Sequence, residues 1–221
     1  MQIAIDGPAG SGKSTIAKIL ADKAGFIYLD TGAMYRGAAW LKQSYELDYP
    51  ALCKMIEDVD YDFADNGRTL RLKYKIGLVV HSEDVTERIR TPEITAMVSE
   101  VAANASLRKV LTAKQREIAD KSNVVMDGRD IGTVVLPMAD VKIFLTASPE
   151  VRAKRRLLEW EAKGQKLDYT QVLSDIIERD RLDSTRETAP LKKAADAVEI
   201  DTSAMTIEEV AEAIKGHMTK K

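Results

Sequence analysis

The sequence has 221 residues, of which 45% are hydrophobic, so it can bury one substantial core in a single unit. Its formal net charge of −2 argues against a general nucleic-acid binder, and no apolar run approaches the length that spans a membrane. The single cysteine, Cys53, excludes an internal disulfide and is compatible with a reducing compartment, so we expect a cytoplasmic protein without a nucleic-acid or membrane partner.

The first predicted element is an apolar strand over residues 1–6, which runs into a glycine-rich turn and then into a helix. Gly7, Gly12, Lys13 and Ser14 satisfy the spacing G-x-x-x-x-G-K-[ST] of a phosphate-binding loop. The residues predicted to hold a polyphosphate are Gly7, Pro8, Ala9, Gly10, Ser11, Gly12, Lys13, Ser14 and Thr15.

The chemistry of this loop explains its residue types. Glycines let the bare backbone N–H groups approach the phosphates, and the helix that begins near Lys13 points its positive end at the anion. Lys13 can reach the β and γ phosphates, Ser14 can ligate Mg²⁺, and Thr15 can contact the α phosphate. A glycine-rich turn without a ligand would not require Lys-Ser after its last glycine. The motif does not decide whether the phosphate is transferred, hydrolysed or sensed.

A second strand is predicted over residues 26–30, after a helix that Gly25 is placed to end. A strand, a helix and a strand in succession predict a parallel sheet with its sites at the carboxyl ends of the strands. Asp30 and Thr31 lie at such an end, followed by Gly32 and Arg36. For Thr31, a binding role and an ordinary helix N-cap remain equally open.

The segment 60–90 changes character, because TLRLKY alternates polar and apolar residues and GLVV is rich in β-forming side chains. It predicts a small antiparallel insert. Thr91-Pro92-Glu93 is then typical of a helix start, and helices are expected over about 92–104 and 106–121.

An apolar strand over 123–127 carries GRDIGT to the same sheet edge as the phosphate loop. Its last residue, Asp127, can hold Mg²⁺ through water, although an acid that caps a turn is the alternative. A fourth strand is predicted over 141–147 and a last one over 196–200, and a capping box from Thr206 to Glu209 opens the C-terminal helix.

Basic residues bracket a polar, glycine-containing stretch, 164–168, between these last two strands. They are Arg152, Lys154, Arg155 and Arg156 before it, and Arg179, Arg181 and Arg186 after it. Such charges usually mark a solvated helix face, but their position around a polar segment also predicts a mobile flap.

With these motifs in place, the sequence resembles the bacterial cytidylate kinase family along essentially its whole length. The stretches that carry the resemblance are IDGPAGSGKST, LDTGAMYRG, residues 84–99, DGRDIGTVVLP, KIFLTAS, RAKRR and ERDRLDSTRETAPL. The phosphate loop alone would match many families, whereas DGRDIGTVV together with the last stretch is much narrower.

The resemblance implies an α/β fold with a P-loop NTPase-type parallel sheet flanked by helices, a small antiparallel monophosphate-binding insert and a helical lid. The core would comprise about 1–48, 91–150 and 191–221, the insert about 49–90 and the lid about 151–190. The implied activity is ATP-dependent phosphorylation of CMP and dCMP to CDP and dCDP, with ATP on the phosphate loop and Mg²⁺ as cofactor. We expect a monomer.

Family roles are carried over only where residues match. Arg36, Arg129 and Arg186 would hold the acceptor phosphate, and Lys13, Arg129 and Arg186 would be catalytic. Ser99, Arg108 and Asp130 would read the cytosine edge. Arg179 and Asp183 would contact the ribose, with Tyr35 and Thr31 beside the nucleotide. Arg152, Arg155 and Arg156 are lid candidates whose roles the sequence does not separate.

Two other interpretations remain. The protein could be a kinase of another monophosphate or of a small polar metabolite, against which only the base-reading residues argue. It could also be a nucleotide-dependent switch, although the sequence has no N-K-x-D guanine motif. For Asp130, the alternative to base reading is that it orients Arg129 or Arg179.

Overall fold

A five-stranded parallel sheet forms the centre of the computed structural model, which describes residues 1–65, 67–162 and 164–218. The strand order is β2-β6-β1-β7-β8, comprising Ile27–Asp30, Val124–Gly128, Gln2–Asp6, Val141–Thr146 and Val198–Asp201. The register pairs Asp6 with Gly128 and Asp30 with Asp127, so β1, β2 and β6 end level with one another. The predicted parallel sheet is therefore confirmed.

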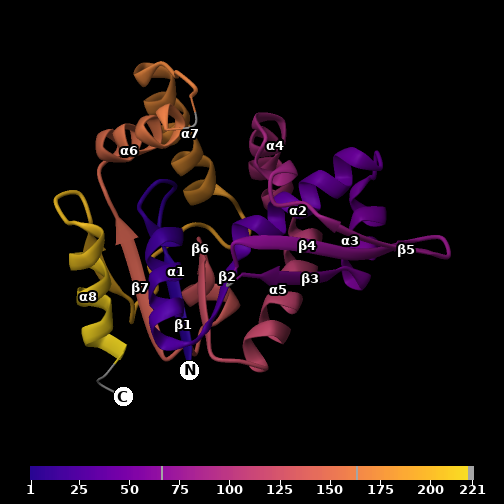
Figure 1. Cartoon of the computed structure of the whole chain (residues 1–221), viewed down its shortest axis with the longest axis horizontal. Helices are drawn as coiled ribbons and strands as arrows, with labels where there is room; N and C mark the ends of the chain where they lie inside the picture. The colour runs from indigo at the N-terminus through magenta and orange to yellow at the C-terminus, as the bar shows by residue number, and fades with distance from the viewer. Residues whose placement is uncertain (66, 163, 219–221) are drawn as a thin grey trace.

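Helices cover both faces of this sheet (Figure 1). Because strand side chains alternate, Ile3 and Ile5 pack in a cluster with α1 (Lys13–Ala24) and α8 (Ile207–Met218). Ala4 points to the other face, where it shares a cluster with residues of α2 (Thr31–Ser44), α4 (Pro92–Ala103) and α5 (Ala105–Asp120). The two cores fix the sheet between two helical layers.

The predicted antiparallel insert is a three-stranded sheet in the order β3-β4-β5, over Asp60–Ala64, Thr69–Ile76 and Val79–Asp84. It follows α3 (Tyr49–Asp58) and leads into a 3-10 turn, η1 (Arg88–Arg90). Leu70, Leu72 and Tyr74 alternate along β4 and are buried in the same cluster as α2. A Cβ on Gly37 of α2 would lie 3.4 Å from Leu72 Cδ1, so this sheet packs closely on α2.

Two helices, α6 (Pro149–Glu161) and α7 (Tyr169–Thr185), stand together above the carboxyl ends of the strands (Figure 1). Their contact has its own small core of Ala153, Val172 and Ile176, separate from the two cores of the main sheet. Ser148 caps α6 by accepting from Val151 N at 3.3 Å.

Other local predictions are also confirmed. Thr91 caps α4, and Thr206 and Glu209 form the reciprocal capping box of α8 at 2.8 and 3.2 Å. A short π-helical turn, η2 (Ile131–Val135), was not predicted. Over the described residues, no helix has the length and apolar character needed to cross a membrane.

Candidate active site

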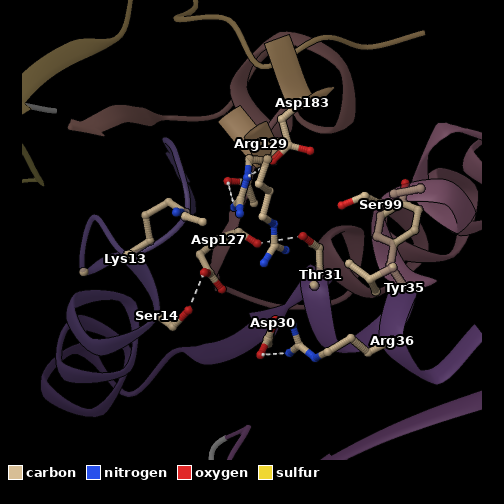
Figure 2. A pocket seen from close by; sticks show the side chains of 18 of the residues that line it. Lys13, Ser14, Asp30, Thr31, Tyr35, Arg36, Ser99, Asp127, Arg129 and Asp183 are labelled. Carbon is tan, nitrogen blue, oxygen red and sulfur yellow. Dashed lines mark hydrogen bonds and ion pairs between the residues drawn. The ribbon is translucent and has the colours of Figure 1, made fainter. Parts of the chain in front are cut away.

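A cavity of about 630 Å³ lies at the carboxyl ends of the sheet, between the phosphate loop and the α6–α7 pair. In Figure 2, Lys13 and Ser14 lie on one side of it, Tyr35 and Ser99 on the other, and Arg129 between them. The predicted site residues that line the cavity are Ala9, Gly10, Gly12, Lys13, Ser14, Thr15, Thr31, Tyr35, Arg36, Ser99, Arg108, Asp127, Arg129, Asp130, Arg156, Arg179, Asp183 and Arg186.

The phosphate loop depends on glycine where the sequence predicted it. Gly7 has φ of 146°, and a Cβ there would lie 1.9 Å from Leu145 O, which no side chain could accommodate. Gly12 is the left-handed N-cap of α1, with φ of 89°. The loop therefore directs backbone N–H groups of the helix start into the cavity.

Lys13 is folded back onto this loop. Its Nζ donates to Pro8 O at 2.6 Å and to Ser11 Oγ at 3.3 Å. Burial, and next the positive charge of Arg129, hold the pKa of Lys13 well below its usual range. Both effects disfavour the charged ammonium of Lys13 while no anion is bound beside it. An anion bound between Lys13 and Arg129 would be attracted by both groups.

Asp127 ends β6 directly opposite the start of α1. Ser14 Oγ donates to Asp127 Oδ2 at 2.8 Å, and Tyr28 OH donates to Asp127 Oδ1 at 2.8 Å. Burial, and then the negative charge of Asp30, raise the pKa of Asp127. A hydroxyl and a carboxylate beside a phosphate loop are a fitting donor set for Mg²⁺, which prefers oxygen ligands and takes few of them from the protein.

One of the two roles predicted for Thr31, that of a helix N-cap, is wrong, because Asp30 caps α2. Asp30 accepts from Ala33 N at 2.8 Å and pairs with Arg36 at 2.9 Å. Burial opposes ionisation of Asp30, but Arg36 and the Ala33 N–H outweigh it and keep its pKa below the ordinary value. Thr31 Oγ1 instead donates to Asp127 O at 2.7 Å and so joins α2 to β6.

At the opposite end of the cavity, arginines and acids form a buried network. Arg108 Nη2 lies 2.5 Å from Asp130 Oδ2, and Arg186 Nη2 lies 3.4 Å from Asp130 Oδ1. Arg129 Nε donates to Asp183 Oδ2 at 2.8 Å. The alternative in which Asp130 orients Arg129 or Arg179 is therefore wrong about the partners, which are Arg108 and Arg186.

Arg179 lines the same end of the cavity. Its Nε, like that of Arg36, is buried and has no hydrogen-bond partner among the described residues. Burial, followed by the charge of Arg129, lowers the pKa of Arg179 to about 10. Nearby, the Arg108 guanidinium lies 5.3 Å from the centre of the Tyr35 ring, so a flat aromatic face borders the same end of the cavity.

The structure separates the three lid candidates. Arg152, on α6, donates to Ala9 O at 3.1 Å and pairs with Asp180 of α7 at 2.6 Å, which ties the phosphate loop to both α6 and α7. Arg155 donates to Thr202 O at 2.6 Å, away from the cavity. Arg156 alone of the three lines the cavity, with its guanidinium 5.5 Å from the centre of the Trp160 ring.

Sequence reasoning missed Asp6, the last residue of β1. Its carboxylate accepts from Ile131 N at 2.8 Å and from Gly132 N at 2.7 Å, in the turn that follows Asp130. Burial raises the pKa of Asp6 to about 6. The signal was available, because Asp6, like Asp127, is an acid that ends an apolar strand. Lys18, Asp30, Arg90 and Glu159 also line the cavity and were not predicted as site residues.

A phosphate loop at the N-terminus of α1, a parallel sheet and a cation-rich cavity define the class of P-loop kinases. The solved shikimate kinase of Bacteroides thetaiotaomicron has this fold, with a TM-score of 0.50 and 14% identity over 99% of this chain and 98% of that one.

The family follows from the sequence comparisons. A family model described as cytidylate kinase matches residues 3–220. The cytidylate kinase of Carboxydothermus hydrogenoformans is 50% identical over 95% of this chain and 93% of that protein. That of Bacillus licheniformis is also 50% identical, over 99% and 96%. The chain belongs to the cytidylate kinase family and is thus a phosphotransferase, as the resemblance predicted.

Proposed function

We propose that this protein transfers the γ phosphate of ATP to CMP and dCMP in pyrimidine nucleotide metabolism, acting in the cytoplasm as a monomer. One observation carries the proposal above all. The phosphate loop and the buried pair of Arg108 and Asp130 line the same cavity, so a donor phosphate and a cytosine ring can be held at its two ends.

The donor end would bind ATP through the loop amides and Lys13. Mg²⁺ would be held by the Ser14 hydroxyl and, through water, by Asp127, and when bound it would neutralise charge on the β and γ phosphates. The 2.8 Å contact between Ser14 and Asp127 supports this pairing. Lys13 now donates to Pro8 O, and it would exchange that carbonyl for a phosphate oxygen when ATP binds.

The acceptor end would hold the monophosphate through Arg36, Arg129 and Arg186. Each of them already faces a carboxylate, Asp30, Asp183 or Asp130, so the guanidinium groups are oriented before substrate arrives. Ser99, Arg108 and Asp130 would contact the cytosine edge, and Arg179 and Asp183 the ribose. The unpartnered Nε of Arg179 supports a role as a donor to substrate.

Phosphoryl transfer needs positioning and charge stabilisation rather than a protein nucleophile. Two anions must approach each other, and arginines from α2, α7 and the turn after β6 would offset their repulsion. Residues 151–190 would close as a lid and exclude water, with Arg156 as the lid arginine that already lines the cavity. Slower hydrogen exchange in this segment when both nucleotides are bound would support closure, and equal exchange would count against it.

The experiment that tests the function is a coupled assay of ADP release with CMP, dCMP, UMP and AMP as acceptors. CMP and dCMP should be used with the highest kcat/KM. Equal use of all four would overturn the base-reading part of the proposal. ATP hydrolysis that no acceptor accelerates would instead favour a nucleotide-dependent switch.

A further inference from the structure

Tyr28 is a completely buried tyrosine of β2 whose hydroxyl reaches the candidate metal-site acid. It donates to Asp127 Oδ1 at 2.8 Å, while Ser14 donates to Asp127 Oδ2 at 2.8 Å. Thr31 holds the carbonyl of the same residue at 2.7 Å. Asp127 is thus held through both carboxylate oxygens and its backbone, and Tyr28 is the one of these three partners without a predicted site role.

The Tyr28 ring is itself fixed by the antiparallel sheet. A Cβ on Gly67, in the turn between β3 and β4, would lie 2.4 Å from Tyr28 Cδ1 and 2.8 Å from Tyr28 O. The next residue, Arg68, pairs with Asp22 of α1 at 3.3 Å. The turn therefore sits directly on β2, and only glycine allows this approach.

Such a contact has a geometric consequence for the acid. A donor on Oδ1 limits rotation of the carboxylate, which keeps Oδ2 toward Ser14. Residues that hold a metal-site carboxylate in this way contribute strongly to metal affinity.

We propose that Tyr28 is a positioning residue that orients Asp127 at the Mg²⁺–nucleotide site, and that the turn at Gly67 holds Tyr28 in place. The proposal rests on the metal role proposed above for Asp127. It connects the antiparallel sheet to the donor end of the cavity through one side chain.

Tyr28→Phe tests the hydroxyl, because it keeps the ring and removes only the donor. Tyr61→Phe is the matched control, since Tyr61 is also buried and its hydroxyl has no partner in the described part of the chain. Mn²⁺ is titrated into each protein saturated with ADP, and bound Mn²⁺ is measured by electron paramagnetic resonance. We expect Tyr28→Phe to weaken Mn²⁺ binding by about 10- to 100-fold, with metal-free ADP affinity unchanged. Tyr61→Phe should alter neither.

Asp127→Asn separates the two levels of the proposal. If Asp127→Asn weakens Mn²⁺ binding and Tyr28→Phe does not, the role of Tyr28 is overturned and that of Asp127 stands. If Asp127→Asn binds Mn²⁺ like the wild type, the metal role of Asp127 fails and the Tyr28 proposal with it. If Tyr28→Phe weakens the binding of metal-free ADP as much as the binding of Mn²⁺, the Tyr28 hydroxyl has only a structural role and the proposal is overturned.

A pair of glycines tests the turn. Gly67 and Gly77 both have left-handed backbones, with φ of 74° and 58°, but a Cβ on Gly77 would meet nothing within 4 Å. Both alanine variants therefore carry backbone strain, and only Gly67→Ala also pushes on Tyr28. Gly67→Ala should weaken Mn²⁺ binding toward the Tyr28→Phe value, and Gly77→Ala should not. Equal effects would remove the turn from the proposal.

Discussion

The two ends of the cavity are built in different ways. The donor end is made by nine successive residues, 7–15, whose backbone shape comes from glycines with positive φ. The acceptor end is assembled from separate helices and the turn after β6, and consists of side chains paired across long sequence distances. Asp130, for example, meets Arg108 22 residues before it and Arg186 56 residues after it.

This difference affects how each end should respond to mutation. At the donor end, the backbone forms the phosphate-binding loop without help from the Lys13 side chain. Removing that side chain should therefore affect phosphoryl transfer and leave the fold intact. At the acceptor end, the guanidinium groups of Arg108, Arg129 and Arg186 are each paired with a carboxylate. Removing one partner leaves an uncompensated charge, which typically destabilises a protein by about 3–5 kcal/mol. Binding and stability should therefore change together there.

The largest effect is expected from Lys13→Ala. It should reduce kcat for phosphoryl transfer by about 10³- to 10⁵-fold, the scale seen when a charge-stabilising residue is lost in such reactions. The melting temperature should stay close to that of the wild type, because in the described part of the chain Lys13 Nζ donates hydrogen bonds only within its own loop, to Pro8 and Ser11.

Lys23→Ala is the control for Lys13→Ala, because Lys23 is the exposed lysine in the last turn of the same helix. Its turnover should match that of the wild type. Near-normal turnover of Lys13→Ala at saturating ATP would contradict a role for Lys13 on the transferring phosphate.

The same contrast explains what the sequence could predict. The phosphate loop and the parallel sheet follow from local patterns, since spacing and strand polarity determine them. The cap of α2 does not, because Asp30 and Thr31 are adjacent and both suit an N-cap. The choice depends on Asp127 O of the neighbouring strand, which takes the Thr31 hydroxyl. Likewise, Arg152 and Arg155 differ only in what packs against α6, and the sequence does not show that.

Asp6 offers a way to test how the two ends are joined. It directly precedes the phosphate loop and binds the N–H groups of Ile131 and Gly132, just after Asp130. Burial raises its folded-state pKa from 3.8 to about 6. The folded state therefore holds the proton more tightly than the unfolded state. This contribution to stability is present below about pH 4 and is lost as the pH rises through 6.

We expect the free energy of unfolding of the wild type, relative to that of Asp6→Asn, to fall by about 3 kcal/mol between pH 4 and 7, at about 1.4 kcal/mol per pKa unit. Urea unfolding of both proteins across this range measures the difference. Asp201→Asn is the control, since hydrogen bonds from Ser203 lower the pKa of Asp201, so that its titration lies below this pH range and its difference from the wild type should stay constant. If the difference in free energy of unfolding between the wild type and Asp6→Asn stays constant across this pH range, Asp6 does not titrate within it.

The smallest effect, and the most specific, concerns the choice of base by Asp130. Cytosine presents a 4-amino donor where uracil presents a carbonyl acceptor, so a carboxylate attracts the first and repels the second. Although Asp130 already pairs with Arg108 and Arg186, a carboxylate has about four acceptor positions and can accept one more donor. One such polar contact discriminates by about 1–3 kcal/mol, or about 10- to 150-fold.

Asp130→Ala should therefore lower kcat/KM for CMP more than for UMP and narrow their ratio by that factor. Removing the acid also leaves Arg108 and Arg186 without their carboxylate, so overall activity and stability should fall as well. The ratio of the two substrates cancels this general loss, because both are measured on the same protein. If Asp130 only orients the two arginines, CMP and UMP will decline together. An unchanged ratio would remove Asp130 from the base-reading residues and leave it as the counter-charge of the acceptor end.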